Sequence, residues 1–370
     1  MSNLHPVDTA IEKGIKEGVF PGASLLVGKE NKILWNKVYG SAQIDPKKRS
    51  VEPPTLFDIA SLTKPMAIAT LFMLVLQEKK CFLDDPLKKY FPETTQQGIT
   101  LQHLLNHTSG LPAWRPYYEE MLALAPGWAA EDKGKNWLVE EILAEPQEAP
   151  VGKKTVYSDL GYILLGAILE KIYGKSLDLL FRQKIAEPLN LKKTFFNPLG
   201  HHRKPVDGNP DHFAATEKCP WRQKILCGEV MDDHAWLMGG IAGHAGLFST
   251  AEEVQKWIAE LQKARHSRSK LISRETFNRF TVIPDGRDMN VPYFTFGFDT
   301  PSAHASCGQY FSPNSIGHLG YTGCSFWWDM DKDIYAILLT NRVHPSREND
   351  RIRVFRPKIH NTIIESLNLT

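Results

Sequence analysis

The chain has 370 residues, of which 42% are hydrophobic and 23% charged, which are ordinary proportions for a globular protein with a sizeable core. A formal net charge of +2 argues against a dedicated nucleic-acid-binding protein, which would carry a concentrated basic excess. The longest apolar run, Ala67 to Leu76, is about half the ~20 residues that a membrane helix needs, and the N-terminal residues do not resemble a secretory signal. We therefore expect a soluble, cytoplasmic protein without a membrane span, or a periplasmic one if a leader has been removed.

The predicted elements begin with a helix over residues 6–17, followed by two alternating strands within 23–39. An apolar helix is predicted over 63–78. The middle of the chain, about 83–235, is mostly helix and loop, with its clearest helix over 161–173.

The C-terminal third returns to strand patterns at 294–298, 325–328 and 335–339, and the chain closes with a helix over about 354–367. Strands at both ends with helices between them favour an α+β fold, in which one antiparallel sheet is assembled from both ends of the chain. We expect a single catalytic domain with an α/β lobe (about 1–60 plus 240–370) and an inserted, mostly helical lobe (about 61–239).

Five cysteines are scattered along the chain without a C-x-x-C pair. An odd, scattered set is typical of reduced thiols, so we expect neither a disulfide framework nor a structural zinc site. No cofactor is expected from any motif in the sequence.

The first motif with catalytic chemistry is Ser61-Leu62-Thr63-Lys64, an S-x-x-K element at the start of the apolar helix. A serine hydroxyl needs a nearby base to act as a nucleophile, and residues three apart share one helix face. A partly buried Lys64 would have a lowered pKa and serve as that base. By itself, so short a motif also arises by chance.

Two further motifs have both a structural and a catalytic interpretation. Tyr157-Ser158-Asp159 directly precedes the helix predicted to start at residue 161. In the structural interpretation Ser158 or Asp159 caps this helix; in the catalytic one, a Tyr157 of lowered pKa shuttles protons. The stretch from Gly317 to Gly323 is either a glycine-rich turn or a strand edge that a substrate approaches closely, with His318 bonding its carboxylate or carbonyl.

Together, the three motifs resemble the serine β-lactamase and penicillin-binding-protein superfamily, which is marked by S-x-x-K, Y-x-N and then K-T-G or H-x-G. The chain looks closest to the class C-like branch, which includes D-Ala-D-Ala carboxypeptidases and β-lactamase-like esterases. Two accessory stretches, Leu104 to Pro112 and Gly239 to Thr250, also match this branch. The resemblance implies the β-lactamase/transpeptidase-like fold.

The resemblance also implies a role for each matched residue. Ser61 would attack the carbonyl, and Lys64 and Tyr157 would transfer the protons. The backbone N–H groups of Ser61 and Tyr321 would form the oxyanion hole. The residues that would line the substrate cleft are Asp159, His318 and Gly320.

Two departures from the family pattern bear on the substrate. Asp159 stands where asparagine is usual, so it has no amide to donate to a substrate carbonyl, and its charge favours protonated Lys64. His318 stands where many relatives have lysine, so recognition of a carboxylate should be weaker and dependent on pH. Both departures favour small esters or amides over β-lactams.

We therefore expect a serine hydrolase that forms an acyl-enzyme on Ser61, with esterase-like activity as the leading hypothesis. The alternatives are a class C-like β-lactamase or D-Ala-D-Ala carboxypeptidase, and a catalytically degenerate binding protein. The expected partner is a small ester, amide or β-lactam substrate rather than a nucleic acid.

Overall fold

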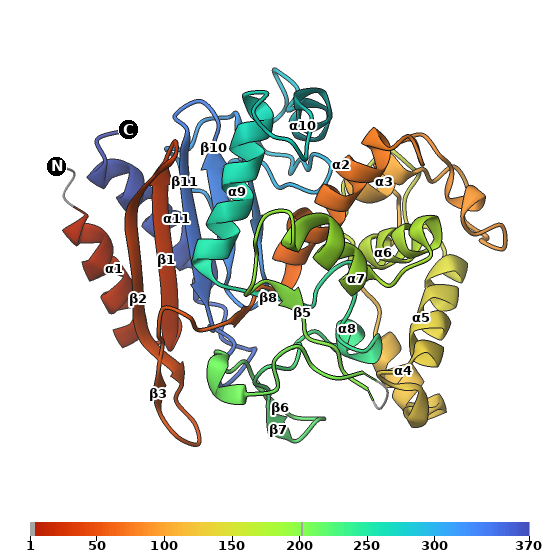
Figure 1. Ribbon diagram of the computed structural model, residues 1–370, viewed down its shortest axis with the longest axis horizontal. Helices are drawn as coiled ribbons and strands as arrows, with labels where there is room; N and C mark the ends of the chain where they lie inside the picture. Colours follow the sequence, from red (N-terminus) through yellow and green to blue (C-terminus); the bar gives the residue numbers. More distant parts are fainter. Residues whose placement is uncertain (1–3, 201–202, 370) are drawn as a thin grey trace.

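The computed structural model describes residues 4–200 and 203–369 and has a six-stranded antiparallel sheet at one side (Figure 1). The strand order is β3-β2-β1-β11-β10-β9, so strands from both ends of the chain lie side by side in it. The strands are β1 (Gly22–Lys29), β2 (Lys32–Gln43), β3 (Arg49–Ser50), β9 (Ser315–Leu319), β10 (Ser325–Asp329) and β11 (Ile334–Thr340). The predicted α+β fold, with a sheet built from both chain ends, is confirmed.

Helices cover both faces of this sheet because its central strands are buried on both sides. Leu25 of β1 belongs to the apolar cluster formed with α1 (His5–Lys16) and α11 (Ile352–Ser366). The next residue, Leu26, belongs to the larger cluster that includes α9 (Ala251–Arg265). Successive side chains of a strand point to opposite faces, so this alternation separates the two helical layers.

The remaining helices lie mostly beyond the sheet, on the other side of the molecule (Figure 1). They are α2 (Thr70–Gln77), α3 (Leu101–Leu105), α4 (Tyr117–Leu124), α5 (Asp132–Ala144), α6 (Asp159–Tyr173), α7 (Leu177–Phe181), α8 (Asp233–Leu237) and α10 (Arg274–Thr281). Five short strands accompany them: β4 (Phe57–Asp58), β5 (Phe195–Phe196), β6 (Lys218–Cys219), β7 (Lys224–Ile225) and β8 (Leu247–Ser249). The division into two lobes near residues 60 and 240 stays a prediction.

The predicted apolar helix over 63–78 is a composite of three helical forms. A 3₁₀ turn, Ala60–Leu62, leads into a π-helical stretch, Lys64–Ala69, which continues as α2. Pro65 has no N–H to give to an α-helical ladder, and the carbonyl of Pro65 accepts a bond from Thr70 Oγ1 at 2.9 Å. The segment Ala60–Gln77 is long and apolar enough to cross a membrane, but 83% of it is buried inside the fold, as in a core helix.

The predicted strand over 294–298 is wrong. The chain makes a tight turn there, in which Thr295 N–H donates to the carbonyl of Phe298 and Gly297 has a φ of 99°. A Cβ at Gly297 would lie 2.5 Å from the Cβ of Ala69, so only glycine lets this turn pack against the core helix. Phe294, Phe296 and Phe298 alternate with other residues, which is the pattern of a half-buried strand, but in the structure they belong to a turn.

Candidate active site

Ser61 and Lys64 lie at a cavity of about 790 Å³, where Ser61 is part of the lining. The Lys64 side chain is completely buried beneath it. Its Nζ donates to Ser61 Oγ at 2.8 Å, to Asp159 Oδ1 at 2.7 Å and to the His244 carbonyl at 3.1 Å. The amine therefore has three acceptors, one of which is the candidate nucleophile.

The chain bends sharply just before Ser61 so that the hydroxyl faces the cavity. Ala60 has a φ of 47°, in the left-handed region that alanine rarely adopts. The buried carboxyl of Asp58 holds this bend, since Oδ1 accepts from Ala60 N–H at 2.9 Å and Oδ2 from Met231 N–H at 2.8 Å. Local strain of this kind persists where the surrounding structure fixes it, as at active sites.

Burial lowers the pKa of Lys64, because a charged amine loses its hydration inside the protein. The negative charge of Asp159 and its hydrogen bond to Nζ act in the opposite direction and raise it in part. The net lowering increases the fraction of neutral amine near neutral pH, which is the form that accepts a proton from Ser61.

Tyr157 is also at the site: it lines the cavity with Ser61, and Lys64 Nζ lies 4.8 Å from the centroid of its ring. Its ring lies against the buried His107, with ring centroids 4.5 Å apart. The expected lowering of the Tyr157 pKa is wrong: burial and the negative charge of Asp159 raise it well above 10. Tyr157 is therefore a neutral phenol near neutral pH, with a proton it can donate, rather than a phenolate base.

The predicted helix cap in Tyr157-Ser158-Asp159 is confirmed, and the two residues beside the cap line the cavity. Ser158 is the N-cap of α6, and its Oγ accepts a hydrogen bond from Gly161 N–H at 3.3 Å. Asp159 is the first residue of this helix and extends to Lys64, while Tyr157 precedes the cap. One capped helix end thus positions two of the predicted site residues.

His318 lies at the end of β9 and lines the cavity, but its ring is almost entirely buried. Burial, helped by the nearby Lys64 charge, lowers the pKa of His318 to about 3. The expected change of charge near neutral pH is therefore wrong. With Nδ1 2.9 Å from the Leu319 carbonyl, the neutral ring donates there and presents Nε2 as an acceptor.

Gly320 and Tyr321 follow His318 along the cavity wall, as the sequence predicts. A Cβ at Gly320 would lie 2.6 Å from the Ile59 carbonyl, so glycine lets this edge approach the segment that precedes Ser61. The Tyr321 side chain is 52% exposed. Among the described residues, no acceptor takes the Tyr321 N–H, which leaves it available to a substrate oxygen.

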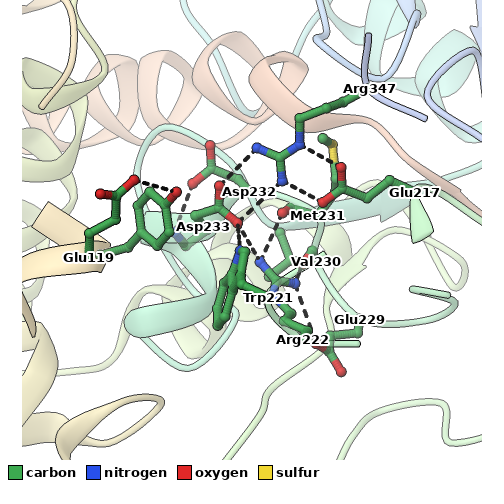
Figure 2. Close-up of polar contacts among 12 residues, drawn as sticks. Glu119, Glu217, Trp221, Arg222, Glu229, Val230, Met231, Asp232, Asp233 and Arg347 are labelled. Carbon is green, nitrogen blue, oxygen red and sulfur yellow. Dashed lines mark hydrogen bonds and ion pairs between the residues drawn. The ribbon is translucent and has the colours of Figure 1, made fainter. Parts of the chain in front are cut away.

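Sequence reasoning missed several charged residues of the cavity wall. Asp232, Asp233 and Arg347 line it, and the Arg347 guanidinium lies between Glu217 and Asp233 (Figure 2). Asp232 and Asp233 stand at the start of α8, and Arg347 follows 114 residues after Asp233; none of the three belongs to a catalytic motif. The sequence predicts only a structural role for the stretch from Gly239 to Thr250, whereas in the structure its His244 carbonyl accepts a bond from Lys64.

Comparison with known proteins agrees with this geometry. The family model described as Beta-lactamase matches residues 7–357. The chain is 32% identical to an N-acetylmuramyl-L-alanine amidase of Bacillus subtilis strain 168, covering 92% of this chain and 81% of the relative. It is 31% identical to a putative D-alanyl-D-alanine carboxypeptidase of Escherichia coli K12, covering 93% and 83%.

Solved structures show the same fold. EstCE1, a hydrolase with promiscuous acyltransferase activity, superposes with a TM-score of 0.74 at 19% identity, over 96% of this chain and 97% of its own. The octameric penicillin-binding protein homologue from Pyrococcus abyssi superposes with a TM-score of 0.73 at 20% identity, over 99% and 77%. The protein therefore belongs to the beta-lactamase family of serine hydrolases.

Proposed function

We propose that the protein hydrolyses an amide bond in peptidoglycan fragments through an acyl-enzyme on Ser61. The observation that carries this proposal is the combination of a nucleophile–lysine pair with a large cavity lined by charges of both signs. A muramyl peptide offers amide N–H groups and carboxylates that such a wall would bind. An apolar ester has no carboxylate or amide N–H of its own to offer to this wall.

The charged groups of the cavity are unusually numerous for a site that takes a small apolar acyl group. Ligand pockets of about 300–1,000 Å³ are mostly apolar, with few polar groups. This cavity lies within that size range. Its charged lining residues are Asp58, Asp159, Asp232, Asp233, Asp299, Arg342, Arg347, Glu348, Asp350, Arg353 and Arg356.

The proposed reaction begins with transfer of the Ser61 proton to neutral Lys64 as Oγ attacks the substrate carbonyl. The N–H groups of Ser61 and Tyr321 stabilise the oxyanion. Tyr157, a neutral phenol, relays a proton to the departing amine, which leaves Ser61 acylated. Water, deprotonated by the same lysine–tyrosine pair, then attacks the ester and frees Ser61.

The names of the relatives support a cell-wall substrate. The two curated relatives named above match more than nine tenths of this chain, and both names specify peptidoglycan bonds. They differ in the bond: one name specifies the amide of N-acetylmuramate with L-alanine, and the other a D-Ala-D-Ala bond. We propose the muramyl amide, because that relative is named for it without qualification.

Hydrolysis of small esters is a second candidate, favoured by Asp159. Its carboxylate accepts from Lys64 and has no N–H to polarise a substrate carbonyl. An ester carbonyl needs less activation than an amide, so the missing donor would matter less for esters.

The test is product analysis by liquid chromatography and mass spectrometry after incubation with a muramyl pentapeptide, with p-nitrophenyl acetate and a chromogenic cephalosporin assayed in parallel. We expect release of the intact peptide from N-acetylmuramate by the wild-type protein and none by Ser61→Ala. Release of D-alanine alone would indicate the carboxypeptidase instead. Turnover of the ester with no muramyl peptide cleavage would favour the esterase and overturn the proposal.

A further inference from the structure

We propose that Asp232, His234 and His244 form a binding site for a divalent transition-metal ion, Zn²⁺ by the chemistry of its donors, in the wall of the catalytic cavity. Each of the three residues offers one ligand atom, and these atoms all lie within 4.8 Å of one another. Zn–N and Zn–O bonds of about 2.0–2.2 Å place tetrahedral ligands about 3.4 Å apart, so small side-chain rotations close the shell. Two imidazoles and a carboxylate are a donor set that Zn²⁺ accepts, with a fourth position left open.

The two imidazoles are buried, yet several of their ring nitrogens have no partner. His234 is completely buried, and neither Nδ1 nor Nε2 is hydrogen-bonded; the Nδ1 of the buried His244 is also without a partner. Buried polar atoms are paired in the great majority of cases, so three orphaned nitrogens in two neighbouring rings are unusual. A metal ion bound through one ring nitrogen of His234 would pair one of these three atoms.

The backbone already brings the three side chains together. Asp232 is the N-cap of α8 and accepts from Ala235 N–H at 2.8 Å, and His234 is the second residue of that helix. His244 approaches from the glycine-rich loop before β8, where its Nε2 donates to Asp232 Oδ1 at 2.7 Å. The His234 and His244 ring centroids are 6.3 Å apart. An ion would take the place of the proton between His244 and Asp232.

An ion can enter this site from the cavity. Asp232 lines the cavity and its side chain is 28% exposed, so one ligand faces solvent while the two histidines lie behind it. The indole of Trp114, also a lining residue, has its ring centroid 5.4 Å from that of His234. The open coordination position would therefore face the cavity.

A second group of potential metal ligands lies nearby but is less suited to an ion, because its carboxylates are already paired with arginines. It consists of Glu217, Cys219 and Asp233. Arg347 bonds both Glu217 and Asp233, and Arg222 bonds Asp233 as well (Figure 2). The two arginines already neutralise these carboxylates and occupy their lone pairs. In the described part of the chain, no arginine or lysine is hydrogen-bonded to Asp232, His234 or His244 through their side chains.

The test is metal binding by the purified full chain, measured apart from activity. After treatment with a chelator, the protein is titrated with Zn²⁺ in competition with a chromophoric chelator, and separately with Co²⁺, whose visible spectrum reports tetrahedral N/O coordination. We expect a single Zn²⁺ per chain and a raised unfolding temperature, since a ligand that binds only the folded state stabilises it. Failure of the wild-type protein to bind Zn²⁺ or Co²⁺ would overturn the proposal.

Variants assign the site. His234→Gln and Asp232→Asn should each weaken Zn²⁺ binding at least tenfold and abolish the Co²⁺ band. Ser61→Ala should bind normally, which separates the metal site from the proposed hydrolysis. The matched control is His212→Ala, because His212 is an exposed histidine paired with Asp207 at 2.7 Å. Loss of binding in the His212 control, or unchanged binding in His234→Gln, would show that the ion binds elsewhere.

Discussion

At the scale of single residues, the proposed reaction depends on the protonation state of Lys64. Burial lowers its pKa and Asp159 raises it in part, so the two effects oppose each other at one amine. The S-x-x-K spacing predicted the contact of Lys64 with Ser61, and the structure gives it at 2.8 Å. The direction of the Tyr157 pKa could not be predicted, because it depends on the packing of His107 and Asp159 around the phenol.

Asp159→Asn tests this balance. Removal of the carboxylate takes away the charge that stabilises protonated Lys64, so the pKa of Lys64 falls further. The acidic limb of the profile of kcat/KM against pH should then move to lower pH. The new amide should also increase acylation by a cephalosporin relative to ester hydrolysis, since it can donate to the carbonyl.

The matched control for this variant is Asp285→Asn, an exposed aspartate that does not line the cavity. Its pH profile should coincide with that of the wild-type protein. An acidic limb that stays in place, or moves upward, in Asp159→Asn would contradict the role given to this carboxylate.

At the scale of elements, the site depends on close contact between α6 and the loop that carries His244. A Cβ at Gly243 would lie 2.0 Å from the Tyr162 carbonyl, and one at Gly166 would lie 3.1 Å from the Cα of Gly243. Glycine at both positions lets the loop lie against the helix. The sequence identified Gly239 to Thr250 as a recurrent stretch, but the contact it makes depends on a helix some 80 residues earlier, and spacing alone does not report it.

Gly243→Ala should disturb this contact. The added methyl group meets a backbone oxygen that cannot rotate away, so we expect a loss of about 3 kcal/mol in the free energy of unfolding, within the range of overpacked cores. The His244 carbonyl would move from Lys64, and kcat should fall more than KM rises. Urea unfolding and steady-state kinetics measure both effects.

Gly127→Ala provides the control, because a Cβ at Gly127 meets nothing within 4 Å. It should change stability by less than about 1 kcal/mol, as surface substitutions usually do. An equal loss in the free energy of unfolding in Gly243→Ala and Gly127→Ala would show that the close contact of Gly243 with α6 does not limit the size of the side chain at that position.

At the scale of the whole molecule, much of the fold followed from simple patterns. The sequence has apolar strands near both ends of the chain and a long helical middle, which predicts one sheet with strands from both ends. In the structure, β1 pairs with β11 in that sheet. The prediction of a strand over 294–298 is wrong, because the chain turns there to pack Gly297 against Ala69, and this contact cannot be inferred from the local sequence pattern. The charged wall of the cavity could not be predicted, since residues such as Asp232 and Arg353 meet there only in the folded chain.

Buried histidines should make the whole fold less stable in acid. Burial lowers the pKa of His360 in α11 to about 4, below its ordinary value of 6.5, and it lies far from the catalytic motifs in the sequence. The unfolded chain therefore binds this proton more tightly than the folded one. The stabilisation is fully present above about pH 6.5 and is lost as the pH falls toward 4, by up to about 3 kcal/mol.

His360→Gln removes this titrating group. Urea unfolding at pH 7, 5.5 and 4.5 should show a flatter dependence of the free energy of unfolding on pH than in the wild-type protein. The substitution also removes the bond between Nδ1 and the Ser306 carbonyl, so the variant starts from a lower stability at pH 7. Parallel pH profiles for the two proteins would contradict the assignment.

The most direct test of the central claim is mass spectrometry of the protein quenched during turnover of a muramyl peptide or a slow β-lactam. The account predicts an acyl adduct that maps to the peptide containing Ser61, and its absence in Ser61→Ala. Wild-type turnover with an adduct on another residue, or undiminished turnover by Ser61→Ala, would contradict it.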